Sequence, residues 1–258
     1  MKIELNDLYD YIPLKIYQNN SYFKFSLDSV LLAEFVKKPE KATNILDMCS
    51  GNGAVSMILS TKTNAKIISV ELQKEIFDLG VKSVSYNKLN NQIKCVNSDI
   101  KCVENYFPGN KFDVIVCNPP YFNSKNNDLI NDERVKAVAR HEIYIKLEEI
   151  VQIASKLLDL NGEFYMVHRP ERLDEIIIQC NKYNLNVKNI QFICTKMNIS
   201  PKLVLVRCIK GSKNNVKILP NLCIDGLKSF KNIFWKEWYH EGYSRFRKSW
   251  KKVWINET

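Results

Sequence analysis

The order of strand-like and helix-like segments is the feature that most constrains the fold of this chain. Buried strands rich in aliphatic residues are predicted at four places. Apolar residues at helical spacing follow each of the first two strands. The four segments lie at 44–48 (NILDM), 66–72 (KIISVEL), 92–99 (QIKCVNSD) and 112–117 (FDVIVC). Strands that alternate with helices are typical of a parallel sheet, so we predict an α/β fold.

The second half of the chain indicates how this sheet is completed. Helical spacing runs from residue 145 to a stop at Gly162, and a strand is predicted at 163–169. A helix opened by Pro170 follows. Two further strands, 189–195 and 202–210, are close in sequence. We therefore expect an antiparallel strand pair to close the sheet.

An unusual tetrapeptide, Asn118-Pro119-Pro120-Tyr121, comes directly after the strand at 112–117. Proline lacks an N–H and restricts the residue before it, so this segment is stiff and extended. The Asn118 side-chain oxygen and a neighbouring carbonyl could together hold one –NH2 group, beside the flat face of Tyr121. A rigid loop exit would explain two prolines alone, but the tetrapeptide should arise by chance in roughly a few chains per thousand.

A tight turn with glycines at 51 and 53 follows the first predicted strand, in the segment LDMCSGNGA. Gly51-x-Gly53 lets the backbone approach a ligand, although many strand-to-helix turns contain such a pair. Ser56 stands where a dinucleotide fingerprint has its third glycine, and nothing obvious would hold a pyrophosphate. We therefore favour another adenosine-bearing ligand over a nicotinamide dinucleotide.

Carboxylates at three successive strand ends support this hypothesis. Asp47 precedes the glycines, and Glu71 ends the second strand, where it can accept hydrogen bonds from both ribose hydroxyls. Asp99 ends the third strand, within reach of an adenine amino group. Each carboxylate alone is equally well explained as a solvated cap, but three in this pattern favour a ligand with a cationic amino-acid tail.

Composition narrows the classes of protein further. The 258 residues are enough for one large domain, with no basic-then-apolar signal and no apolar run of bilayer-spanning length, so we expect a cytoplasmic protein without a membrane partner. The eight cysteines lack C-x-x-C pairs and should be reduced. The three histidines form no His-Cys cluster, so no metal is expected.

The formal net charge of +10 points to a polyanionic partner. An excess of lysine can reflect coding bias alone, but between residues 228 and 252 basic residues are interleaved with Phe, Trp and Tyr. We predict that this tail binds the phosphates of a polyanion; the alternative is a terminal helix docked through its tryptophans with a solvated basic face. The proposed phosphate contacts are Arg245, Arg247, Lys248, Lys251 and Lys252.

Taken in order, these motifs resemble the class I S-adenosylmethionine-dependent methyltransferases that methylate amines. That resemblance implies a Rossmann-like, seven-stranded mixed sheet of order 3-2-1-4-5-7-6, with strand 7 antiparallel and helices on both faces. Within the class, the segments at 25–35 (FSLDSVLLAEF), 118–122 (NPPYF), 139–142 (ARHE) and 166–173 (MVHRPERL) are similar to the bacterial tRNA adenine-N6 methyltransferases that modify A37 of valine tRNA.

The resemblance also implies roles for particular residues, with S-adenosylmethionine as cofactor and tRNA as partner of a monomer. The catalytic residues would be Asn118, Pro119, Pro120 and Tyr121. Cofactor contacts would come from Ser26, Asp28, Asp47, Gly51, Gly53, Glu71, Asp99, Ile100 and Asn118. Tyr121, Arg140 and His141 would contact the substrate RNA. The expected division is a covering segment at 1–40, a catalytic domain at 41–220 and a basic appendage at 221–258.

Several alternatives remain open from the sequence. Glutamine methyltransferases of release factors, guanine-N2 enzymes of ribosomal RNA and DNA adenine methylases share the N-P-P-Y motif. An RNA-binding module that has lost catalysis would keep the same fold. A surface ion pair with Glu142 would explain Arg140 and His141, and an ordinary helix N-cap would explain the segment around Asp28.

Overall fold

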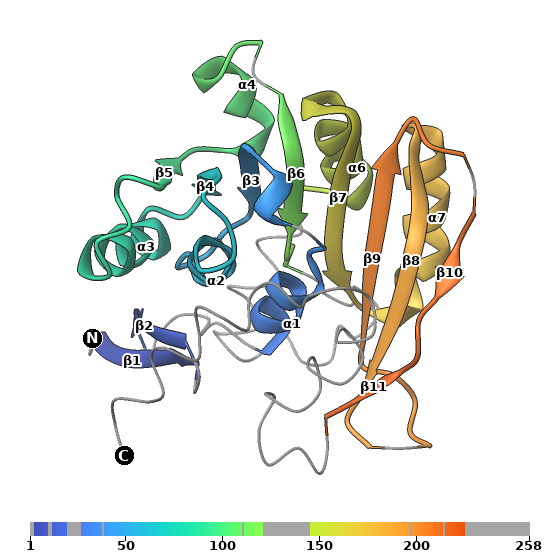
Figure 1. Cartoon of the computed structure of the whole chain (residues 1–258), viewed down its shortest axis with the longest axis horizontal. Helices are drawn as coiled ribbons and strands as arrows, with labels where there is room; N and C mark the ends of the chain where they lie inside the picture. The colour runs from blue at the N-terminus through green and yellow to red at the C-terminus, as the bar shows by residue number, and fades with distance from the viewer. Residues whose placement is uncertain are drawn as a thin grey trace, which may run out of the picture.

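A computed structural model describes most of the chain. The described residues are 3–9, 12–19, 27–37, 39–109, 111–120, 145–196, 198–213 and 215–224. Within them the chain forms a large mixed sheet, helices on both of its faces and a separate two-stranded hairpin (Figure 1).

The strand order of the large sheet is β10-β8-β9-β7-β6-β3-β4-β5, with β11 also paired to β8. Its long parallel strands are β3 (Asn44–Met48), β4 (Lys66–Glu71), β5 (Ile93–Asn97), β6 (Phe112–Cys117) and β7 (Leu158–His168). Strand β9 (Leu203–Lys210) runs antiparallel to both β7 and β8 (Leu185–Cys194). Counted along the chain, these seven strands have the order 3-2-1-4-5-7-6 with the seventh antiparallel, so the predicted fold class is confirmed. Two short strands that were not predicted, β10 (Lys217–Ile218) and β11 (Leu222–Cys223), extend the sheet beyond β8.

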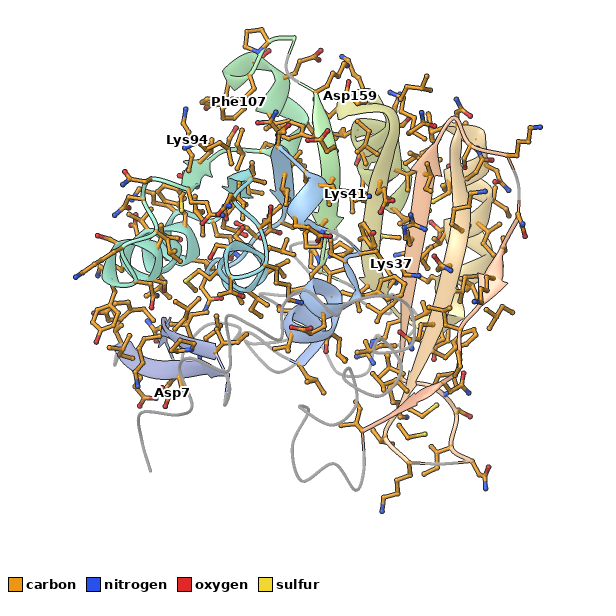
Figure 2. All side chains as sticks on the ribbon, viewed as in Figure 1. Asp7, Lys37, Lys41, Lys94, Phe107 and Asp159 are labelled. Carbon is orange, nitrogen blue, oxygen red and sulfur yellow. The ribbon has the colours of Figure 1, made fainter. Side chains whose placement is uncertain are left out.

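Helices cover both faces of the sheet because alternate side chains of each central strand point to opposite sides. Ile45 of β3 packs with α1 (Leu27–Phe35) and α2 (Ala54–Ser60), whereas Leu46 packs in a second apolar cluster with α6 (Leu147–Leu157) and α7 (Leu173–Lys182). Side chains fill the space on both sides of the sheet in Figure 2. The remaining helical segments are η1 (Pro39–Lys41), α3 (Lys74–Tyr86), η2 (Ile100–Cys102), α4 (Val103–Tyr106) and η4 (Pro170–Arg172).

The N-terminal hairpin was not predicted, and it docks on α3 and on the glycine turn. It consists of β1 (Ile3–Tyr9) and β2 (Ile12–Asn19), paired antiparallel. Asn87 binds the β2 backbone at both ends of its amide: Oδ1 accepts from the Lys15 N–H at 2.9 Å, and Nδ2 donates to the Lys15 carbonyl at 2.7 Å. The Tyr17 N–H donates to Ser83 Oγ at 2.9 Å, and Asn52 Nδ2 donates to the Tyr17 carbonyl at 3.2 Å. These bonds hold the hairpin next to the turn that follows β3.

The predicted helix stop at Gly162 was wrong, because α6 ends at Leu157 and Gly162 lies inside β7. Leu158 already pairs with Phe112, and Asn161 turns the chain with a φ of 64°. A Cβ at Gly162 would lie 2.9 Å from the Asp159 carbonyl oxygen, so the glycine permits a tight turn within the strand rather than ending the helix.

Candidate active site

The turn between β3 and α2 has an unusual backbone. Cys49, Gly51 and Gly53 have positive φ values of 56°, 58° and 84°, a region that only glycine enters without strain. The Ser50 N–H donates to the Val70 carbonyl of β4 at 2.8 Å. The predicted glycine turn is therefore tied to the end of the neighbouring strand.

Asp47, near the end of β3, is almost completely buried, with 1% of its surface exposed. Its Oδ2 accepts hydrogen bonds from the backbone N–H of Ser56 at 3.1 Å and from the Ser56 hydroxyl at 2.6 Å. Its Oδ1 is buried and has no hydrogen-bond partner among the described residues. Burial raises the pKa of Asp47 to about 7, although the hydrogen bonds from Ser56 oppose this. Asp47 thus offers one unused acceptor beside the turn.

Glu71 lies at the end of β4 and joins the turn to the next helix. Its Oε2 accepts from the Gly51 N–H at 2.9 Å, and its Oε1 accepts from the Gln73 N–H at 2.8 Å. Burial raises the pKa of this carboxyl, and the backbone hydrogen bonds from Gln73 and Gly51 counteract the effect. A carboxylate has about four lone-pair sites, so both oxygens can each accept one further hydrogen bond.

The third predicted carboxylate, Asp99, follows β5 at the same edge of the sheet. Its Oδ1 accepts from the Lys101 N–H at 2.9 Å and caps η2, in which Ile100 is buried. Between the two strands, Asn97 Nδ2 donates to the Glu71 carbonyl at 2.8 Å. The strand order β3-β4-β5 therefore places Asp47, Glu71 and Asp99 side by side at the carboxyl ends of three adjacent strands, in the order that the sequence predicts.

The Asn118-Pro119-Pro120 segment emerges from β6 on the other side of β3. Cys117 pairs with Met48, so the segment and the glycine turn leave adjacent strands at the same level of the sheet. Pro119 is buried and Asn118 is half-buried. Asn118 Nδ2 donates to the hydroxyl of Ser29 in α1 at 3.2 Å. Among the described residues, no hydrogen bond to the side-chain oxygen Oδ1 of Asn118 is seen.

Ser29 was not identified from the sequence. The segment FSLDS marked a helix start, and Asp28 does lie in the first turn of α1, half-exposed. No local pattern pointed to a contact with Asn118, because 89 positions separate the two residues.

His168, the last residue of β7, is a further buried polar group at this edge. Burial and the positive charge of Arg172 lower the pKa of its ring to about 3, so it is neutral at ordinary pH. Its Nδ1 accepts from the Arg169 N–H at 2.8 Å, which places the ring proton on Nε2. Its neutral ring makes it unsuited to bind a phosphate by charge.

Several predicted site residues lie outside the described residues, and their roles stay predictions. They are Ser26, Tyr121, Arg140, His141, Arg245, Arg247, Lys248, Lys251 and Lys252.

Across residues 3–224, excluding the undescribed gaps, no cluster of three or more His, Cys, Asp or Glu side chains could hold a metal ion. No helix in the same described part of the chain is long and apolar enough to cross a membrane.

The acceptor groups at this end of the sheet fit a cationic, hydroxyl-bearing ligand. The unpartnered Oδ1 of Asp47 is a buried acceptor, and leaving such a group unsatisfied costs about 1 to 3 kcal/mol. Glu71 and Asp99 add further acceptors along the edge, and Asn118 adds a neutral one. An anionic ligand such as a pyrophosphate would meet like charge here.

Comparison with known proteins defines the class. The sequence pattern of the methyltransferase small domain family matches residues 20–191, and the chain belongs to this family. This membership and the class I fold imply S-adenosylmethionine as the methyl donor, whose cationic amino-acid end and ribose hydroxyls suit the acceptors just described.

Individual relatives make the comparison more specific. The chain is 27% identical over 209 residues to the tRNA1(Val) (adenine(37)-N6)-methyltransferase of Pedobacter heparinus, covering 81% of this chain and 86% of the relative. It is 27% identical over 205 residues to the protein of the same name from Photobacterium profundum, covering 77% and 82%.

Solved structures agree on the fold. A predicted O-methyltransferase from Agrobacterium tumefaciens superposes with a TM-score of 0.62 at 22% identity, over 79% of this chain and 90% of that one. The 16S rRNA N2 G1207 methyltransferase of T. thermophilus superposes with a TM-score of 0.55 at 18% identity, over 81% and 50%. The resemblance found in the sequence is confirmed at the level of family and fold.

Proposed function

We propose that the protein transfers a methyl group from S-adenosylmethionine to the exocyclic N6 of an adenine in tRNA, specifically A37 in the anticodon loop of valine tRNA. The position of Asn118 carries this proposal, because its side-chain amide follows β6 at the same level as the glycine turn that follows the adjacent strand β3, with Nδ2 held by Ser29. The names of the relatives supply the RNA and the position.

The cofactor would be held along the edge formed by β3, β4 and β5. Glu71 would accept from the ribose hydroxyls, Asp99 from the adenine amino group, and the unused Oδ1 of Asp47 from the ammonium end. When bound, the cofactor supplies an electrophilic methyl group on a positively charged sulfur.

Asn118 and Pro119 would act on the amine. The N6 amine of adenine is a poor nucleophile because its lone pair is delocalised into the ring. Accepting one N–H at Asn118 Oδ1 and the other at the Pro119 carbonyl would favour tetrahedral geometry and localise the lone pair on nitrogen. Tyr121 would stack on the base, which must leave its stack to be reached.

Methyl transfer to defined RNAs tests the proposal. Valine tRNA transcribed without modifications should accept labelled methyl groups, and a transcript with A37 replaced by G should not. Digestion should release the label as N6-methyladenosine. Equal labelling of both transcripts would refute the position, and labelling of a release factor instead of tRNA would favour the glutamine alternative.

An Asn118→Ala variant tests the role of the carbonyl. We expect turnover to fall to less than a tenth while affinity for S-adenosylhomocysteine stays nearly unchanged, because the carbonyl acts on the amine in the transition state. A variant that keeps a tenth or more of its activity would contradict this assignment.

A further inference from the structure

We infer that Ser29 is a positioning residue that holds the Asn118 side chain where the substrate amine is proposed to bind. Its hydroxyl oxygen accepts a hydrogen bond from Asn118 Nδ2 at 3.2 Å. This inference rests on the proposed role of Asn118. The contact joins α1 to the end of β6, two elements far apart in the sequence.

The orientation matters because the two ends of an amide have the same shape and opposite hydrogen-bonding character. The oxygen accepts and the nitrogen donates. With Nδ2 directed to Ser29, Oδ1 is left to accept an N–H from the substrate amine. In the reversed orientation Nδ2 would face the substrate amine, donor against donor, and the amine would lose its acceptor. The Ser29 hydroxyl can donate as well as accept, so its contact holds the side chain in place and the substrate amine completes the choice of end.

The surroundings of Ser29 hold the hydroxyl in place. Ser29 is 7% exposed, and the residues that follow it in α1, from Val30 to Ala33, are buried in the apolar cluster between α1, α2 and the sheet. A hydroxyl in such a setting needs a polar partner, and Asn118 supplies one. Because α1 is fixed by packing, the contact fixes the amide in turn.

The expected effect follows from the strength of one neutral hydrogen bond. Replacing Ser29 with Ala releases the Asn118 side chain from α1, and we expect kcat to fall about three- to tenfold. KM for RNA and affinity for S-adenosylhomocysteine should change less than twofold, because Ser29 is not proposed to touch either. Ser29→Thr keeps the hydroxyl and should retain most of the activity.

Adding Ser29→Ala to an Asn118 variant separates an effect on the position of Asn118 from an effect on packing. In an Asn118→Ala variant there is no side-chain amide left for Ser29 to position. Adding Ser29→Ala to that variant should change its residual rate less than twofold. The same three- to tenfold loss in both backgrounds would mean that Ser29 acts through packing, and the inference would be wrong.

A spectroscopic measurement keeps the test independent of the substrate. In ¹⁵N spectra, the side-chain NH2 signal of Asn118, assigned by its absence in Asn118→Asp, should shift in Ser29→Ala. The matched control is Ser155→Ala in α6, where a hydroxyl that donates to the Tyr183 carbonyl at 2.6 Å is lost on the other side of the sheet. This control should leave the Asn118 signal unmoved.

The methylation rate and the Asn118 signal together distinguish a failure of this inference from a failure of the proposed function. An Asn118 signal that is unchanged in Ser29→Ala overturns the inference. A shifted signal in a protein that methylates no tRNA supports the contact and refutes the proposed function alone.

Discussion

Replacing Asp47 with Asn should make the protein more stable at neutral pH, by an amount that depends on pH. Asn resembles the protonated form of Asp47: its carbonyl can still accept both hydrogen bonds from Ser56, and it carries no charge into a site that is 1% exposed. The wild-type carboxyl must instead either bind a proton or be buried as an anion.

The size and sign of this stability difference follow from the pKa of Asp47. Burial raises the pKa of Asp47 from 3.8 to about 7 in the folded protein. Between about pH 4 and pH 7 the folded state keeps a proton that the unfolded chain has lost, so the free energy of unfolding falls as the pH rises through this range. The difference between these pKa values corresponds to roughly 4 kcal/mol. The Asp47→Asn variant lacks this contribution and should gain that amount over wild type at pH 7.5 and almost nothing near pH 4.

Urea denaturation of both proteins at several pH values between 4 and 8 measures the effect. Taking the difference between the two proteins cancels the contributions of other titrating groups. A stability difference that stays constant over the whole range, or that shrinks as the pH rises, would refute the argument that Asp47 is buried with a raised pKa.

Three further predictions concern ligand binding and activity. Glu71→Ala should weaken S-adenosylmethionine and S-adenosylhomocysteine alike by about ten- to hundredfold in calorimetry, because a charge-assisted pair of hydrogen bonds is worth about 1.5 to 3 kcal/mol. It should also lower the unfolding free energy, since the Gly51 and Gln73 N–H groups lose their acceptor; unchanged affinity for both ligands would move the ribose site elsewhere. Tyr121→Phe should keep far more activity than Tyr121→Ala, and equal losses would show that the hydroxyl matters instead of the ring. Changing the five basic residues proposed as phosphate contacts in the 228–252 tail to Ala should weaken tRNA binding and flatten its salt dependence by close to one log unit of slope per lost contact, whereas identical slopes would favour the docked-helix alternative.

The central strands could be predicted from the sequence because parallel strands are buried on both faces. Such strands are short, continuous apolar runs, and β6 matches its predicted bounds of 112–117 to the residue. The hairpin β1–β2 mixes charged and apolar residues, and its position depends on the side chains of Ser83 in α3 and of Asn87 directly after it. The end of α6 was missed because Leu158 continues the helical spacing although it pairs with Phe112.

The candidate site also has parts that the sequence predicts and parts that it does not. Asp47, Glu71 and Asp99 could be placed from sequence, since the ends of parallel strands meet at one edge of a sheet. The contacts that set their chemistry could not: the hydroxyl of Ser56 on Asp47 and that of Ser29 on Asn118 come from helices whose packing a linear pattern does not specify.

The way the hairpin docks has a consequence for how the sequence can diverge. The backbone of β2 forms hydrogen bonds with the side chains of Asn87, Ser83 and Asn52. These bonds therefore depend on the three partner side chains and not on the side chains of β2. Side chains at positions 15 and 17 are therefore interchangeable as far as these bonds are concerned, apart from proline, which lacks the N–H. Related chains should vary at positions 15 and 17 while they preserve an amide at 87 and apolar side chains at the buried positions 12 and 16.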